Sequence, residues 1–126
     1  MSESIEQSNK PLISAQTVRR ILAFRDARSW AQFHNPKDLA ISLSLEASEL
    51  LECFQWSGAD TEVERKRAQM CEELSDVLIY AVLFAERLGI DVDAAMQAKI
   101  KANEARYPVE KSFGSAAKYD ELKGRS

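Results

Sequence analysis

The sequence predicts an all-α fold, a bundle of four helices. Apolar residues recur at spacings of three and four through most of the chain, as they do along one face of a helix. No segment shows the apolar–polar alternation of a half-buried strand. Only four glycines and three prolines interrupt the 126 residues. Few breaks and short connections are typical of a helix bundle within one domain.

The first helix is expected from Ser14, a suitable N-cap, to about Trp30. Residues 1–13 before it are interpreted as a flexible tail. The apolar stripe of this helix contains Val18, Ile21, Leu22 and Phe24. Residues 31–36 are expected to form a loop, because a proline at position 36 disfavours helix at the residue before it.

The second helix is expected from about Pro36 to Trp56, because proline fits the first turn of a helix. At 100° per residue, one face of it carries Leu39, Leu43, Ala47, Leu50 and Phe54. The loop of residues 57–60 separates it from a third helix of residues 61–88, which Gly89 ends.

The fourth helix is expected from Val92 to Arg106, with Asp91 as its N-cap and Pro108 preventing its continuation. The predicted helical domain is therefore residues 14–108. Residues 109–126 are interpreted as a polar tail with a possible helical turn near 118–122.

The composition indicates a cytoplasmic protein with reduced thiols. The two cysteines, Cys53 and Cys71, have no metal-binding spacing, and the N-terminal residues have no apolar signal-peptide core. The net charge of −3 does not predict binding to a nucleic-acid polymer or to an anionic membrane. No apolar run approaches the ~20 residues of a membrane helix.

Two pairs of acidic residues lie within the apolar stripes of the second and third helices. They are Glu46 with Glu49, and Glu73 with Asp76, each pair spaced i, i+3. A carboxylate on a core face is costly unless it is paired or bound to metal. Facing pairs on two helices suit Mg²⁺, which prefers oxygen ligands and keeps positions for water and phosphate.

A second interpretation treats the acids as solvated surface groups, which most helical carboxylates are. Glu72 could also pair with Asp76, but it points away from the stripe that Glu73 shares, so Glu73 is preferred. Two pairs on neighbouring helices favour the metal site over the surface interpretation.

Three segments together resemble the MazG-like all-α nucleoside triphosphate pyrophosphatases. They are LEASELLECFQW (45–56), EELSDVLIYAVLFAERLGID (72–91) and KIKANEARYP (99–108). The segment RSWAQFHNPKDLAISL (28–43) is similar to the dCTP pyrophosphatase branch. Leu45 departs from the broad family motif, which has Glu there; the dCTP branch also lacks that acid. The departure leaves the general base unassigned.

The resemblance implies hydrolysis of a nucleoside triphosphate to the monophosphate and pyrophosphate, with Mg²⁺ (or Mn²⁺ in its place) held by Glu46, Glu49, Glu73 and Asp76. These four are the expected catalytic and metal-binding residues. It also implies a homodimer or homotetramer with sites at subunit contacts.

The resemblance further implies a substrate pocket. The positions that surround the base and sugar in the dCTP branch are occupied in this sequence by Trp30, Phe33, His34, Trp56 and Tyr80. Aromatic faces stack on bases, although without the resemblance core packing is the favoured role for Trp30 and Trp56. On the fourth helix, Lys99, Asn103 and Arg106 are expected at the phosphates, with a solvated face as the alternative.

The expected substrate is dCTP or a modified dCTP, in the sanitation of the nucleotide pool. The alternatives are a broad-specificity nucleoside triphosphate pyrophosphatase and, from another class, a non-catalytic helical interaction module.

Overall fold

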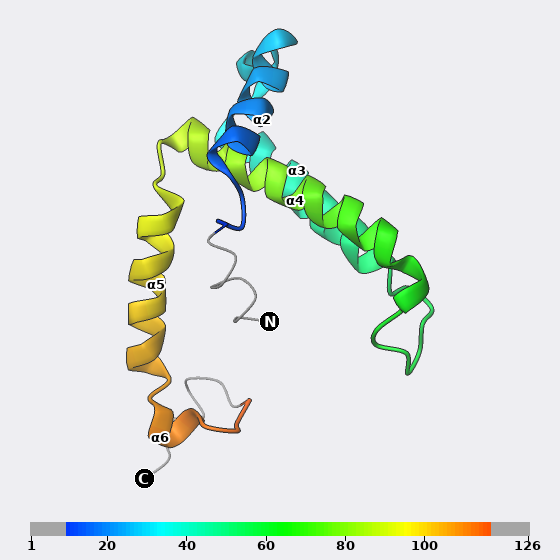
Figure 1. Cartoon of the computed structure of the whole chain (residues 1–126), viewed down its shortest axis with the longest axis vertical. Helices are drawn as coiled ribbons and strands as arrows, with labels where there is room; N and C mark the ends of the chain where they lie inside the picture. Colours follow the sequence, from blue (N-terminus) through cyan, green and yellow to red (C-terminus); the bar gives the residue numbers. More distant parts are fainter. Residues whose placement is uncertain (1–9, 117–126) are drawn as a thin grey trace. The chain divides into compact units, whose positions relative to one another are not determined.

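The computed structural model describes residues 10–116, and within this range the chain is helical and contains no strand (Figure 1). The all-α class is thereby confirmed. The α-helices are α2 (Ala15–Ala27), α3 (Pro36–Glu52), α4 (Arg67–Leu88), α5 (Val92–Arg106) and α6 (Val109–Ser112). Two 3₁₀ helices, η1 (Trp30–Phe33) and η2 (Glu64–Lys66), precede α3 and α4. The turn expected near 118–122 lies outside the described residues.

Local capping chemistry sets most helix ends as predicted. The Ser14 side chain accepts a hydrogen bond from the Thr17 backbone N–H, and Asp91 accepts one from Ala94. Gly89 ends α4 with φ of 65°, a left-handed conformation that glycine adopts without steric cost.

The connection between α3 and α4 differs from the prediction. The second helix ends at Glu52 instead of Trp56, and the third begins at Arg67 instead of position 61. Cys53 and Val63 are fully buried at the two sides of this connection. Asp60 accepts hydrogen bonds from the Glu62 and Val63 backbone N–H groups and so keeps the chain in a turn. The burial of Cys53 and Val63, which helical periodicity does not reveal, therefore makes the connection longer than predicted.

Two other segments also differ from expectation. The first helix ends at Ala27 instead of Trp30. Of the residues 31–36 that were expected to be loop, 31–33 belong with Trp30 to the 3₁₀ helix η1, and Ser29 before it has a left-handed backbone. The short helix α6 lies in the segment interpreted as a polar tail, with Pro108 directly before its first residue.

The described chain divides into two compact units. In the first, residues 1–89, α3 and α4 pack side by side along their lengths, and α2 contacts α4 (Figure 1). Its buried apolar residues are Leu39, Cys53, Val63, Leu83 and Ala85. The second unit, residues 90–126, contains α5 and α6 and is described by itself. None of the side chains of α5 is buried.

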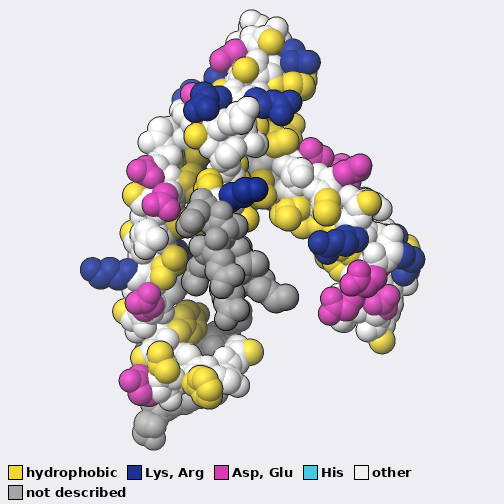
Figure 2. Space-filling model, viewed as in Figure 1, with side chains coloured by type: hydrophobic (Ala, Val, Ile, Leu, Met, Phe, Trp, Pro, Cys, Tyr) yellow, Lys and Arg dark blue, Asp and Glu magenta, His cyan; other side chains and the backbone are white. Residues whose placement is uncertain are grey.

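Large apolar side chains remain exposed along the α3–α4 pair, and Figure 2 shows several of them gathered there. On α3 they include Ile41, Leu45 and Leu51, and on α4 they include Leu74. Contiguous exposed apolar surface of this kind commonly marks an interaction site. Across the described residues, no helix combines the length and apolar character needed to cross a membrane.

Candidate active site

Three carboxylates converge between α3 and α4. Glu46 and Glu49 lie one turn apart on α3, and Glu73 reaches them from α4. Each offers a carboxylate oxygen within 4.8 Å of those of the other two. The side-by-side packing of the two helices thus converts two sequence pairs into one acidic cluster, which contains Glu73 and not its neighbour Glu72.

The closeness of the carboxylates raises the pKa of two members of the cluster, Glu46 and Glu73. The pKa of Glu46 is raised to about 7 by hydrogen bonding with Glu49, by burial and by repulsion from the neighbouring carboxylates. The pKa of Glu73 is raised by burial first and then by Glu49. Three carboxylates this close cannot all stay ionised cheaply unless a cation lies among them.

Two atoms of the cluster also fit a cation. Oε2 of Glu46 and Oε2 of Glu73 are buried and have no hydrogen-bond partner among the described residues. Buried polar atoms normally have a hydrogen-bond partner or a bound ion, and a cation between these two oxygens would supply one. Carboxylate oxygens are the donors that Mg²⁺ and Mn²⁺ prefer. The residues present therefore fit a hard divalent cation.

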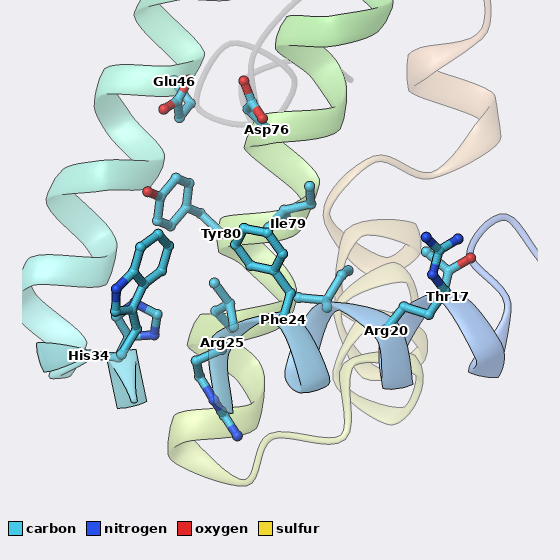
Figure 3. A pocket seen from close by; sticks show the side chains of 12 residues that line it. Thr17, Arg20, Phe24, Arg25, His34, Glu46, Asp76, Ile79 and Tyr80 are labelled. Carbon is cyan, nitrogen blue, oxygen red and sulfur yellow. The ribbon is translucent and has the colours of Figure 1, made fainter. Parts of the chain in front are cut away.

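Asp76 lies beside the cluster rather than in the group of three. It faces Glu46 across one end of a pocket, Glu46 pointing from α3 and Asp76 from α4 (Figure 3). Its charge contributes to raising the pKa of both Glu46 and Glu73. Asp76 is thus close enough to act on the same ligand as the cluster.

The pocket has a volume of about 470 Å³, and its wall joins acidic and aromatic side chains of the first unit. Five residues singled out from the sequence line it: Trp30, His34, Glu46, Asp76 and Tyr80. Tyr80 lies between the acidic end and the aromatic end (Figure 3). A cavity of this size with few polar groups is typical of a small-molecule site.

The α2 side of the pocket was not predicted. Thr17, Arg20, Ile21, Phe24 and Arg25 line it. Ile21 and Phe24 were interpreted from the sequence as core stripe, because periodicity cannot distinguish a face that packs on protein from one that borders a cavity.

The aromatic end is held by contacts among its own residues. The Phe24 and Trp30 rings meet edge to face, with centroids 5.7 Å apart. The Arg28 guanidinium lies 3.6 Å from the Phe24 ring centroid and donates a hydrogen bond to the Phe24 carbonyl. Nδ1 of His34 is buried and has no hydrogen-bond partner among the described residues. The aromatic end of the pocket therefore offers ring faces and the polar edge of the His34 imidazole.

Other predicted residues lie outside this pocket. The Phe33 residue is 63% exposed and Trp56 is 92% exposed, and neither lines the cavity. Trp56 lies in the α3–α4 connection with a left-handed φ of 64°. The residues predicted at the phosphates, Lys99, Asn103 and Arg106, lie on α5 in the second unit. Their part in the site stays a prediction.

Comparison with known proteins places the chain in a family. Residues 41–122 match the MazG-like family. The chain is 44% identical over 119 residues to dCTP pyrophosphatase 1 of Mus musculus, an alignment that covers 89% of this chain and 69% of the mouse protein. It is 42% identical over 121 residues to the protein of the same name from Bos taurus, covering 91% of this chain and 70% of the bovine protein.

A solved structure agrees with these matches. The crystal structure of a pyrophosphatase from Archaeoglobus fulgidus superimposes with a TM-score of 0.70 at 40% sequence identity, covering 74% of this chain and 90% of that one. The resemblance inferred from the three sequence segments is thus confirmed, including its dCTP pyrophosphatase branch. The chain belongs to the MazG-like family.

Proposed function

We propose that this chain hydrolyses dCTP, or a 5-substituted dCTP, to the monophosphate and pyrophosphate, in the sanitation of the nucleotide pool. The oxygen of a water molecule bonds to the phosphorus of the first or the second phosphate, and the bridging P–O bond between these two phosphates breaks. The products are the nucleoside monophosphate and pyrophosphate. The observation that carries the proposal is one pocket bordered at one end by carboxylates and at the other by aromatic rings. The similarity to dCTP pyrophosphatase 1 of several mammals supports this choice of substrate.

In this proposal, Glu46, Glu49 and Glu73 hold Mg²⁺, or Mn²⁺ in its place, and Asp76 completes the donor set at the pocket end. The cation supplies positive charge that attracts the triphosphate and stabilises the charge developing on the phosphoryl oxygens. Without it, the cluster would repel a polyanion. The acids therefore orient the phosphate end of the substrate.

The aromatic end then receives the base. Trp30, Tyr80 and Phe24 offer ring faces, and stacking on an aromatic ring is worth about 1–3 kcal/mol per base. Nδ1 of His34 can accept a hydrogen bond from the exocyclic amino group of cytosine, a donor that uracil and thymine lack. The His34 imidazole edge is thus suited to select among pyrimidines.

The remaining predicted contacts need other parts of the assembly. Lys99, Asn103 and Arg106 of α5 are proposed to bind the phosphates when the chain associates as a homodimer or homotetramer. The exposed apolar side chains of α3 and α4 support such association, because a second copy would bury them. Trp56, exposed in the α3–α4 connection, and Phe33 would then reach the base pocket of another copy.

The test is a screen of natural and modified nucleoside triphosphates for pyrophosphate release. We expect Mg²⁺-dependent release that is fastest with dCTP or a 5-substituted dCTP. Glu49→Gln and Asp76→Asn should each lower kcat/KM at least about a hundredfold, because each removes a cation ligand. Glu52→Gln, also on α3 but outside the cluster, is the matched control and should keep wild-type activity.

Equal rates with purine and pyrimidine substrates would instead indicate broad specificity. Full activity of Glu49→Gln at limiting Mg²⁺ would exclude the proposed metal site. If Mg²⁺ with a non-hydrolysable nucleotide leaves the melting temperature unchanged, the chain is a non-catalytic helical module, because a ligand that binds only the folded state must stabilise it.

A further inference from the structure

An ion pair joins α2 to the last turn of α4. Nη1 of Arg25 lies 2.6 Å from Oε2 of Glu86, across 61 positions of sequence. The Arg25 side chain is 13% exposed and that of Glu86 is 43% exposed. Figure 3 shows Arg25 extending away from the centre of the pocket, toward the C-terminal part of α4. A charge-assisted hydrogen bond this short, with the Arg25 side chain largely removed from water, is stronger than one between two fully exposed side chains.

The guanidinium is also held from its other side. Nε of Arg25 donates to Oδ1 of Asp26 at 2.8 Å, and Nη2 lies 2.8 Å from the same oxygen. Asp26 therefore fixes the plane of the guanidinium, and less rotamer entropy is lost when Nη1 meets Glu86. The contact with Glu86 raises the pKa of Arg25, so the guanidinium stays charged at any physiological pH.

The helix that this pair attaches is packed less deeply than α3 and α4, and its apolar residues Val18, Ile21 and Leu22 are half-buried. None of the thirteen residues of α2 is fully buried, whereas α3 and α4 pack along their whole lengths. Yet α2 supplies one wall of the pocket, including Phe24, the residue directly before Arg25. The opposite wall, with Asp76 and Tyr80, belongs to α4. The ion pair thus connects the two walls of one pocket.

We infer that Arg25 and Glu86 are positioning residues that hold the α2 wall against α4, so that the pair sets the affinity for the nucleobase and leaves the rate of hydrolysis unchanged. This inference rests on the proposed function. Glu86 lies outside the pocket lining, and the Arg25 side chain borders the pocket but extends away from its centre (Figure 3). Their effect reaches the base through the position of Phe24 and, beside it, Trp30.

The experiment measures kcat and KM for dCTP in Glu86→Gln and Arg25→Met. Both variants keep the approximate side-chain volume and remove one charge. We expect KM to rise about tenfold, which matches the loss of one hydrogen bond to a charged group, and kcat to stay within about twofold of wild type. Arg19→Met, an exposed arginine on α2 outside the pocket lining, is the matched control and should keep the wild-type KM.

The double variant Arg25→Met with Glu86→Gln should raise KM no further than either single variant, because all three variants remove the same contact. A lower kcat with an unchanged KM would show that the pair only keeps part of the protein folded, and would overturn the inference. Unchanged KM in both single variants would overturn it too, while the proposed function stands. Absence of pyrophosphate release from the wild-type protein would overturn both.

Discussion

Glu46 combines two properties that rarely coexist in one side chain. It lies within an apolar helix face, and it meets two further carboxylates across that face. The sequence predicted the first property from the helical wheel, and it predicted the preference for Glu73 over Glu72 in the same way. The second property needs the packing of α3 on α4. Its consequence is a pKa of about 7 for the Glu46 carboxyl.

This raised pKa predicts how the stability of the metal-free protein depends on pH. The unfolded chain releases this proton near 4.5, whereas the folded protein keeps it until about 7. Between these values the folded state binds more protons, so the free energy of unfolding should fall as pH rises from about 4.5 to about 7 and then level off. Urea denaturation with a chelator at several pH values measures it.

The control for this prediction is Glu46→Gln, which removes the titrating group. Its free energy of unfolding should not fall with pH on account of this group. The difference in free energy of unfolding between Glu46→Gln and the wild-type protein should therefore widen between pH 5 and pH 7. A constant difference between the two proteins across this range would contradict the prediction. Mg²⁺ at a hundred times its dissociation constant should raise the free energy of unfolding of the wild-type protein by about 2.7 kcal/mol at pH 7.5.

At the scale of the elements, the start of α3 connects stability with the pocket. Oδ1 of Asn35 accepts a hydrogen bond from the Asp38 backbone N–H, and its Nδ2 donates to the Asp38 carboxylate, both at 2.8 Å. His34, the residue directly before this cap, lines the pocket. The cap therefore fixes both the first turn of α3 and the place where His34 leaves η1.

Asn35→Ala should lower the free energy of unfolding by about 1 kcal/mol, the usual cost of losing an N-cap. It should also raise KM for dCTP, because His34 loses a fixed neighbour. Asn35→Ser, which restores a capping oxygen, is the matched variant and should recover most of the stability. Chemical denaturation and steady-state kinetics measure the two effects. Equal stability of the alanine and serine variants would rule out a capping role.

The helices themselves were largely predictable, and the connections were not. Ser14, Gly89 and Asp91 act within a few residues of their own position, so their local chemistry was enough to place helix ends. The connection from Cys53 to Lys66 is set by the burial of Val63, and burial depends on residues distant in sequence. Helix ends in this region were therefore placed too near each other.

At the scale of the whole molecule, Trp56 predicts that active sites are shared between copies. Its side chain is almost fully exposed and does not line the pocket of its own chain. If another copy receives it, two inactive variants can complement each other. Glu49→Gln keeps a normal Trp56, and Trp56→Ala keeps a normal acidic cluster. A hybrid assembly of the two variants then contains one site that has both an unchanged acidic cluster and an unchanged Trp56.

We therefore expect mixtures of these two variants, after subunit exchange, to hydrolyse dCTP faster than the sum of the separate proteins. Pyrophosphate release and light scattering follow activity and assembly together. A mixture of Glu49→Gln with Asp76→Asn is the control, because both changes lie in the same half-site and no recovery is expected. A purely additive rate with Trp56→Ala would show that each copy works with its own residues.

By itself the sequence determined the all-α class, the positions of the main helices and the four acids on two helix faces. It could do so because helical periodicity and capping act over a few residues. The tertiary structure alone decided which acids meet, and that Ile21 and Phe24 of α2 border a cavity instead of a core. The position of α2 depends on packing and on the Arg25–Glu86 pair, whose partners are too far apart in sequence for any local pattern to join them.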